Sequence, residues 1–289
     1  MYIIFTMSKI IFKKYLNDTV VEMLLEAPLI AKKALPGQFV ILRVDQEGER
    51  FPLTIAGYDR EKGLVKIIFQ VVGVSTYKLS LLNEGDDVLD VVGPLGNPTK
   101  LDDYQSVLLV GGGVGCAIAL PIAAELRRQN KKVTSIIGFR NKDLVILEDE
   151  FEKCSDSLIV MTDDGSYKEK GNVTLPLERL LKEDKTKYDV VITIGPLIMM
   201  KFVTLKAKEF NVPVIVSMNP IMIDGTGMCG GCRLSLKKDG QRITKFACID
   251  GPDFDGYLVD FDEAMNRNRQ YLEQERKAYD EACNLLKKK

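Results

Sequence analysis

The middle of the chain alternates apolar strands with helices, and this alternation constrains the fold more than any other feature of the sequence. Five apolar strands are predicted, at residues 107–110, 133–139, 157–162, 190–194 and 212–217. Helices are predicted beside them, at residues 116–129, 144–153, 175–181 and 197–209. Strands buried on both faces and separated by helices are typical of a parallel sheet. The sequence therefore predicts a doubly wound, five-stranded α/β domain over residues 101–217.

Four turns of this domain carry residues that suit a dinucleotide. Ligands of doubly wound sheets bind at the carboxyl ends of the strands, so these turns should meet at one edge. The first turn is a glycine run before a helix, where free backbone amides can hold a pyrophosphate. It lacks the G-x-G-x-x-G fingerprint, and a tight turn without a ligand is the alternative for that run taken alone. The candidate residues are Gly111, Gly112, Gly113, Val114, Gly115, Arg140, Asp163, Asp164, Gly165, Gly195 and Pro196.

Residues 1–100 consist instead of short predicted strands separated by turns. Strands are expected at residues 9–15, 20–26, 39–44 and 64–72, and the turn-rich segment 93–98 is expected to close the domain as a linker. Several short strands with little helical periodicity predict a small antiparallel barrel.

Two segments of this barrel offer contacts for a ligand that carries phosphate. In the string R-F-P-L-T, Arg50 has a fork of donors, Pro52 holds an extended backbone, and Thr54 has a hydroxyl. Ser75 and Thr76 open a short helix predicted at residues 76–82, where they can cap it while free amides bind phosphate. An exposed arginine at a strand start, followed by an edge proline, is the structural alternative for the first segment.

Three cysteines and an aspartate form a pattern typical of a metal centre. Asp224, Cys229, Cys232 and Cys248 are spaced D-x4-C-x2-C-x15-C. Plant-type [2Fe–2S] loops follow C-x4-C-x2-C…C, so Asp224 stands where their first cysteine is expected. Glycines at 225, 227, 230 and 231 let the backbone wrap closely around inorganic sulfide. A zinc site and three merely packed thiols are the alternatives for this module, which is predicted over residues 218–260.

The amino-acid composition excludes several kinds of catalytic site and partner. The chain has no histidine, which removes histidine general bases, Ser-His-Asp triads and histidine metal ligands, so we expect cofactors rather than a catalytic side chain to do the chemistry. The net charge of −1 gives no reason to expect a nucleic-acid partner, and no apolar run reaches the length of a membrane span. Six cysteines, three of them in metal-ligand spacing, indicate a reducing, cytoplasmic compartment.

The last segment, residues 261–289, is predicted to be one long helix. Apolar pairs recur in it every seven residues, at 264/265, 271/272, 278/279 and 285/286, and form a narrow seam. The simpler interpretation is that this seam packs on the rest of the same chain. The more specific interpretation is that it contacts a partner subunit.

Together these segments resemble the ferredoxin–NADP reductase superfamily over residues 8–260. The flavin motif R-x-P-[LIY]-[ST] is matched by Arg50, Pro52, Leu53 and Thr54. A second flavin segment, in which serine replaces a glycine, is matched by Phe69, Gln70, Gly73, Ser75 and Thr76. The nicotinamide turns of the superfamily are matched by the glycine run after the first strand, by residues 163–166 and by Gly195-Pro196.

Within the superfamily, the chain resembles a group that holds two kinds of subunit. One is the electron-transfer subunit of dihydroorotate dehydrogenase B, and the other is the alpha subunit of NADH-dependent reduced ferredoxin:NADP oxidoreductase, also called a sulfide dehydrogenase subunit. The string N-P-I-M-I-D-G-T-G-M-C-G-G-C-R is similar to the second kind, in which an aspartate and three cysteines ligate the cluster. Asp224 therefore favours the second kind.

The resemblance implies FAD, a [2Fe–2S] cluster and NAD(H) as cofactors. Arg50 and the amides of Ser75 and Thr76 would neutralise the FAD pyrophosphate, and Thr54 would be a candidate hydrogen-bond partner of flavin N5. The charges of Arg140 and Lys142 favour NADP(H), whereas the resemblance favours NAD(H), which we retain.

The resemblance also implies a partner, which would be a larger flavoprotein subunit with a second FAD and [4Fe–4S] clusters. The complex would serve ferredoxin and bifurcate electrons among NADPH, NAD and ferredoxin. The predicted function is therefore that of the small electron-transfer subunit in a bifurcating transhydrogenase heterodimer. Two alternatives are an electron-transfer subunit of a dihydroorotate dehydrogenase B type complex, paired with an FMN barrel protein, and a zinc-stabilised binding protein without enzymatic activity.

Overall fold

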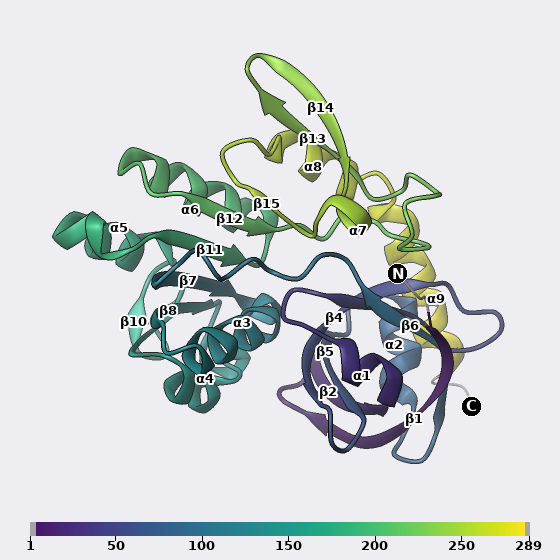
Figure 1. Ribbon diagram of the computed structural model, residues 1–289. Helices are drawn as coiled ribbons and strands as arrows, with labels where there is room; N and C mark the ends of the chain where they lie inside the picture. Colours follow the sequence, from purple (N-terminus) through teal and green to yellow (C-terminus); the bar gives the residue numbers. More distant parts are fainter. Residues whose placement is uncertain (1–3, 287–289) are drawn as a thin grey trace.

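A computed structural model describes the backbone of residues 4–286 and the side chains of residues 7–183 and 186–281. It shows a barrel, an α/β sheet domain and a hairpin module above them, with a C-terminal helix lying along the barrel (Figure 1). No helix in the described part of the chain is long and apolar enough to cross a membrane.

The N-terminal region forms a closed antiparallel barrel, as predicted. Its strands follow one another around the barrel in the order β1-β2-β5-β4-β3-β6. Their bounds are β1 (Ile4–Tyr15), β2 (Val20–Glu26), β3 (Phe39–Arg43), β4 (Phe51–Asp59), β5 (Leu64–Gln70) and β6 (Asp87–Leu95), with helices α1 (Pro28–Lys33) and α2 (Val74–Leu81) between them.

The segment expected as a turn-rich linker begins inside this barrel. Gly93, Pro94 and Leu95 belong to β6, which pairs with β1 and β3. A Cβ atom on Gly93 would lie 2.8 Å from the Val40 side chain of β3. The glycine is therefore needed for close approach of two strands, and its interpretation as a turn residue was wrong.

The second region is a parallel sheet with helices on both faces. Its five predicted strands are β7 (Ser106–Gly112), β8 (Lys132–Phe139), β9 (Ser157–Thr162), β11 (Val190–Ile194) and β12 (Val214–Ser217). Two short strands extend the sheet, so its full order is β10-β9-β8-β7-β11-β12-β15, with β10 (Glu169–Lys170) parallel and β15 (Asp253–Asp255) antiparallel. The order reverses between β7 and β11, which is the switch point where ligands of such sheets bind.

Alternating side chains of the sheet face two separate cores. Val107 and Leu109 pack with α3 (Cys116–Arg128) and α4 (Glu148–Cys154) on one face. Leu108 and Val110 face α5 (Thr174–Asp184) and α6 (Leu197–Glu209) on the other. Continuously apolar strands therefore bury both of their faces, as a doubly wound sheet requires.

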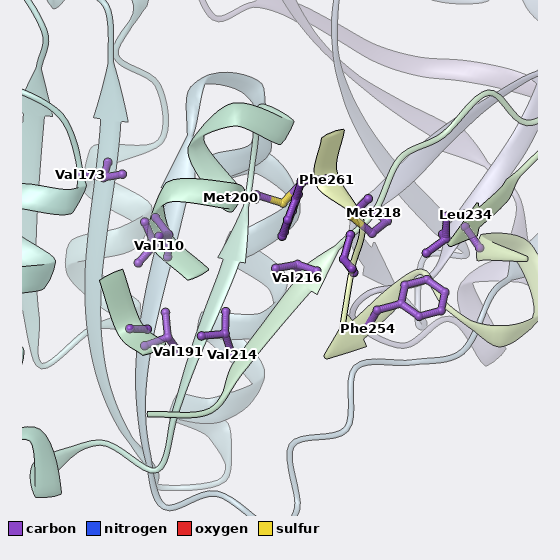
Figure 2. Close-up of a cluster of buried hydrophobic side chains, with 14 of the residues drawn as sticks. Val110, Val173, Val191, Met200, Val214, Val216, Met218, Leu234, Phe254 and Phe261 are labelled. Carbon is purple, nitrogen blue, oxygen red and sulfur yellow. The ribbon is translucent and has the colours of Figure 1, made fainter. Parts of the chain in front are cut away.

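The second of these cores joins the sheet to the rest of the molecule. Figure 2 shows Val214 and Val216 of the sheet near Phe254 and Phe261, which come from the C-terminal part of the chain. The same cluster includes Phe39, Ile41, Val92 and Leu95 on the outer face of the barrel. The barrel, sheet and C-terminal module are thus held by shared apolar burial, which stabilises by about 25 cal/mol per Å² of apolar surface.

The C-terminal module is a hairpin with short helices. It contains β13 (Arg233–Lys238), β14 (Gln241–Phe246) and α7 (Ala247–Asp250), followed by α8 (Phe261–Asn268) and α9 (Leu272–Leu286). The prediction of one helix over residues 261–289 was wrong. α8 packs on α6 and β13, whereas α9 contacts α2 of the barrel, so the chain must change direction between them (Figure 1). Of the predicted seam, the side chains of pair 285/286 lie outside the described residues.

Asp253 of β15 lies where the three regions meet. Its Oδ2 accepts a hydrogen bond of 2.6 Å from Thr99, while its buried Oδ1 has no partner. Burial raises the pKa of this carboxyl above its usual value, while the nearby hydroxyls of Thr99 and Ser217 act in the opposite direction. A raised pKa in the folded state means that stability is fully present at low pH and is lost as pH rises through the titration.

We expect Asp253→Asn to stabilise the protein at pH 8 and to change little at pH 4, because the amide stays neutral. The gain at pH 8 should be about 1 kcal/mol, the order of the cost of a buried unsatisfied group. Thermal unfolding at both pH values measures it. Equal effects of the substitution at the two pH values would contradict this account.

Candidate cofactor sites

Strands β3 and β4 present one face to the barrel interior and the other to the remaining modules. Thr54 pairs with Phe39 and Pro52 pairs with Ile41, and paired residues share a face. Phe39 and Ile41 belong to the core shared with the sheet and the hairpin module. Pro52 and Thr54 are therefore on the outward face, where a flavin can lie. The Leu53 side chain points the other way and packs on the barrel core, so only the backbone of Leu53 could contact a cofactor on the outward face.

The second predicted flavin segment ends β5. Phe69 is buried in the barrel core, while Gln70 is half-buried at the strand end. β5 also contacts the short helix η1 (Gly113–Gly115), which follows the first strand of the sheet. The contact brings the predicted flavin and nicotinamide segments together.

The N-terminus of α2 has the backbone groups that a phosphate could bind. The helix begins at Val74, two residues before its predicted start, and Gly73 is its N-cap with open space around it. Thr76 Oγ1 accepts hydrogen bonds of 3.1 Å from the amides of Val72 and Gly73. The first intrahelical bond runs from the Tyr77 amide to Gly73 O, which leaves the amides of residues 74–76 at the helix start for an anion.

Arg50 lies immediately before β4 and is oriented by an acid. Its Nη2 is 3.4 Å from Oδ2 of Asp90, which also accepts a shorter hydrogen bond of 2.7 Å from Arg43. The Arg50 side chain is 37% exposed, so it lies at the barrel surface. A guanidinium in that position suits a diphosphate, whose oxygens it can bind in pairs.

The four predicted nicotinamide turns do meet at one edge of the sheet. The strand ends are in register there, with Gly112 beside Gly138, Phe139 beside Thr162 and Gly111 beside Ile194. The turns after β8 and β9 are also hydrogen-bonded, because the Asp163 amide donates to Phe139 O and the Lys142 amide donates to Ser166 Oγ. This arrangement is the one expected of a dinucleotide site.

Two glycine turns are in close contact at the switch point. A Cβ on Gly115 would lie 2.5 Å from the carbonyl oxygen of Ile194 and 2.7 Å from Gly195 Cα. Gly113 has a φ of +54° with no atom within 4 Å of a Cβ placed on it. The first glycine is required for packing and the second for backbone conformation. Val114 of the same turn is half-buried against the α3 core.

Arg140 and the aspartates after β9 are exposed at this edge. Hydrogen bonds from Ser166 hold the pKa of the Asp164 carboxyl below its usual value. Asp164 thus uses its side chain to close its own turn, at which Gly165 has a φ of +78°. Pro196, also exposed, is the N-cap of α6.

The aspartate and cysteines of the predicted metal centre lie in two pairs. Sγ of Cys232 and Sγ of Cys248 are 3.2 Å apart in the interior. Asp224 accepts hydrogen bonds from the amides of Thr226 at 2.8 Å and Cys229 at 3.0 Å, and Cys229 is exposed. Among the described residues, no three carboxylates and thiols converge on a point suited to one metal ion. One carboxylate and three thiols supply the number of ligands that a [2Fe–2S] cluster requires.

Protonation of these donors follows from their surroundings. Burial and the neighbouring Cys232 thiol raise the pKa of the Cys248 thiol to about 12. Partial burial of Asp224 opposes its ionisation, but hydrogen bonds from Thr226 and Cys229 outweigh it and lower the pKa of the carboxyl. Asp224 is thus ionised, as an iron ligand must be, whereas Cys248 would have to release its proton to bind iron.

The loop that carries Asp224 packs on the barrel beside the flavin segment. A Cβ on Gly225, whose φ is +72°, would meet Leu95 at 2.7 Å and Ile41 at 3.1 Å. Ile41 pairs with Pro52 of the flavin motif. The predicted cluster loop and the predicted flavin face are therefore separated by about one strand of the barrel.

Asp224→Cys tests the first ligand position. We expect the protein to keep its iron but to show a changed electron paramagnetic resonance spectrum and a midpoint potential shifted by roughly tens of millivolts, because ligand type tunes such clusters. A redox titration of both proteins measures the shift. An unchanged spectrum and potential would remove Asp224 from the ligand set.

Comparison with known proteins agrees with this geometry. Residues 219–260 match the iron-sulfur cluster binding domain of dihydroorotate dehydrogenase B. The dihydroorotate dehydrogenase B electron-transfer subunit homolog of Thermotoga maritima is 49% identical over 274 residues, which is 95% of each chain. The electron-transfer subunit from Streptococcus pneumoniae is 34% identical over 252 residues, which is 85% of this chain and 94% of the relative.

Solved structures extend the comparison. A NADH-dependent reduced ferredoxin-NADP oxidoreductase, studied for flavin-based electron bifurcation, aligns with a TM-score of 0.88 and 48% identity over 96% of this chain and 98% of that one. The ferredoxin reductase of carbazole 1,9a-dioxygenase aligns with a TM-score of 0.63 at 18% identity, over 74% of this chain and 68% of that one, which shows a shared fold.

The fold and its sites define a flavin- and iron-sulfur-dependent electron-transfer oxidoreductase. Within that class, the chain belongs to the family of dihydroorotate dehydrogenase B electron-transfer subunits. Family membership supports FAD, a [2Fe–2S] cluster and NAD(H) as its cofactors. Because the relatives are subunits of larger complexes, a partner subunit is implied.

Sequence reasoning missed several residues that support these sites. Asn97 donates its amide to Gly251 O at 2.7 Å and its side chain to Ile249 O at 2.9 Å, which ties the end of the barrel to the cluster module. Asp90 holds Arg50, and Arg233 and Arg267 contact the cluster loop. Arg233 directly follows Cys232, which is a usable signal, but the other contacts depend on tertiary structure.

Proposed function

We propose that this chain is the small subunit of an electron-bifurcating, NADH-dependent ferredoxin:NADP oxidoreductase. The single observation that carries this proposal is Asp224, which takes the place of a first cysteine and is held toward Cys229 by its hydrogen bonds. The 48% identity over almost the whole of a bifurcating oxidoreductase chain supports it. A dihydroorotate dehydrogenase B type complex is the second candidate, favoured by the names of the two relatives described above.

The proposed mechanism assigns positioning to the chain and chemistry to its cofactors. When bound, the flavin exchanges electron pairs with the nicotinamide, and the cluster carries electrons singly. Arg50 and the backbone amides at the start of α2 hold the diphosphate of FAD. Thr54, on the outward face of the barrel, donates a hydrogen bond to flavin N5. The glycine turns at the switch point hold the dinucleotide, with NAD(H) preferred and NADP(H) as the alternative. Asp224, Cys229, Cys232 and Cys248 hold the cluster in a reducing compartment, for which we retain the cytoplasm.

The proposed partner is a larger subunit that bears FAD and [4Fe–4S] clusters and passes electrons to ferredoxin. Affinity purification of the tagged chain from its native cell, with mass spectrometry, tests this. A large FAD/[4Fe–4S] flavoprotein is the expected partner. Recovery of an FMN barrel protein with dihydroorotate oxidation would establish the second candidate instead.

Truncation after Gln270 tests whether α9 contributes to this assembly. α9 is largely exposed and contacts the barrel through a T-shaped pair of Tyr77 and Tyr279, with ring centroids 5.8 Å apart. α8 stays in place, because its Phe261 belongs to the core. We expect binding of the partner to weaken by about tenfold, as for loss of an interface anchor. FAD content is the control, and full retention of the partner by the truncated chain would exclude α9 from the contact.

A further inference from the structure

Two arginines from different elements bind the backbone between two of the predicted cluster ligands. Arg233, at the start of β13, donates from Nη1 to Gly230 O at 3.3 Å. Arg267, in α8, donates from Nη2 to Gly231 O at 3.4 Å. Gly230 and Gly231 are the two residues between Cys229 and Cys232. Each of their carbonyl oxygens therefore accepts a hydrogen bond from an arginine guanidinium. Both arginines line one small pocket together with Gly231.

One of these contacts connects directly to a cysteine sulfur. The peptide unit whose carbonyl accepts from Arg233 also contains the Gly231 amide, and this amide donates to Sγ of Cys229 at 3.4 Å. A cation on the carbonyl side of a peptide polarises its N–H group and strengthens the bond that the N–H donates. Hydrogen bonds to cluster sulfurs and nearby charge are the means by which proteins tune cluster potentials.

Neither arginine is held in an ion pair in the part of the chain that the structure describes. Within the described residues, neither Arg233 nor Arg267 forms a salt bridge with a carboxylate. The acids of α8 have other partners, since Asp262 binds Lys201 at 2.7 Å and Glu263 pairs with Arg242. Arginine stays charged at all ordinary pH values, so its effect does not depend on titration.

We propose that Arg233 and Arg267 are positioning residues that raise the reduction potential of the cluster, acting through the Gly230 and Gly231 peptides. The inference rests on the proposed function to the extent that the cluster must be bound. Reduction adds a negative charge to a centre already ligated by thiolates and a carboxylate, and nearby cations favour that more negative state. The two arginines thereby offset the anionic Asp224 and keep the cluster able to accept electrons.

The test is a redox titration of the purified full-length chain, followed by electron paramagnetic resonance of the cluster. Arg233→Gln and Arg267→Gln should each shift the equilibrium of the cluster with a reference couple about tenfold toward the oxidised form, which is about 59 mV for one electron. The corresponding Arg→Lys variants should have reduction potentials between those of the unaltered protein and the glutamine variants, because lysine keeps the charge but lacks the planar guanidinium. Lys238→Gln is the matched control, since it removes a charge at the hairpin tip and should leave the potential unchanged.

Equal potentials in the unaltered protein and both glutamine variants, at full iron content, would overturn the inference. An equal decrease in Lys238→Gln would also overturn it, because net charge alone would then explain the shift. If a glutamine variant binds too little iron to titrate, its lysine variant decides, and a potential at or above that of the unaltered protein is the contrary result. Absence of any cluster signal in the unaltered protein would instead contradict the proposed function.

Discussion

Replacing Cys232 by serine is expected to remove the cluster while leaving reduction of the flavin by NADH intact. The Cys232 sulfur is buried 3.2 Å from that of Cys248, and a serine oxygen there is a harder, shorter ligand for iron. Iron and sulfide should fall to background, and electron delivery to a one-electron acceptor should fall on the order of a hundredfold or more. Iron analysis and anaerobic flavin bleaching by NADH measure the two effects separately.

Cys154→Ser is the matched control for this substitution. Cys154 is a half-buried free thiol at the end of α4, on the α3 and α4 side of the sheet. Its loss should leave iron content and electron delivery unchanged. If Cys232→Ser kept two irons and an unaltered spectrum, Cys232 would not be a ligand and the two-pair arrangement would be wrong.

The second large effect is expected at the switch point of the sheet. In Gly115→Ala, the added methyl group would meet backbone atoms of Ile194 and Gly195 at 2.5 and 2.7 Å, and backbone atoms cannot move aside as a side-chain tip can. The turn that contains Gly115 must therefore move away from the end of β11. We expect the efficiency of flavin reduction by NADH to fall by about tenfold to a hundredfold, the range that small displacements of bound reactants produce.

Gly57→Ala provides the comparison for Gly115→Ala. A Cβ on Gly57 would lie 3.5 Å from the Lys66 side chain, which is ordinary contact. This control should reduce its flavin at the normal rate, and both variants should keep FAD and iron. Normal kinetics in Gly115→Ala would show that the contact between the two turns does not position the nicotinamide.

The strands and helices that could be predicted well are those with a single dominant signal. Val20–Glu26, Ser157–Thr162 and Val190–Ile194 were predicted with their final bounds, and so was the helix Leu197–Glu209. β4 and β6 contain prolines and glycines that normally mark turns, yet both are strands, and in β6 Gly93 allows close approach to Val40 of β3. The break between α8 and α9 depends on which surfaces each helix covers, which the seven-residue repeat does not encode.

In the candidate site, too, some residues could be predicted from local spacing, whereas others depend on tertiary structure. Spacing along the chain identified Asp224 and the three cysteines, because cluster loops are local motifs. It could not show that Cys232 and Cys248 are adjacent, since a hairpin folds between them. The outward orientation of Pro52 and Thr54, opposite to Leu53, follows from strand alternation once β4 is recognised. Arg267 is distant in sequence from the loop that it contacts, so tertiary packing alone revealed it.

An anaerobic titration of the purified full-length protein with NADH, followed by visible absorption and electron paramagnetic resonance, tests the central claim most directly. We predict that NADH bleaches a bound flavin and that the spectrum of a reduced [2Fe–2S] cluster then appears. A colourless protein that contains zinc but no flavin would contradict the account, and so would a flavin that bleaches without any cluster signal.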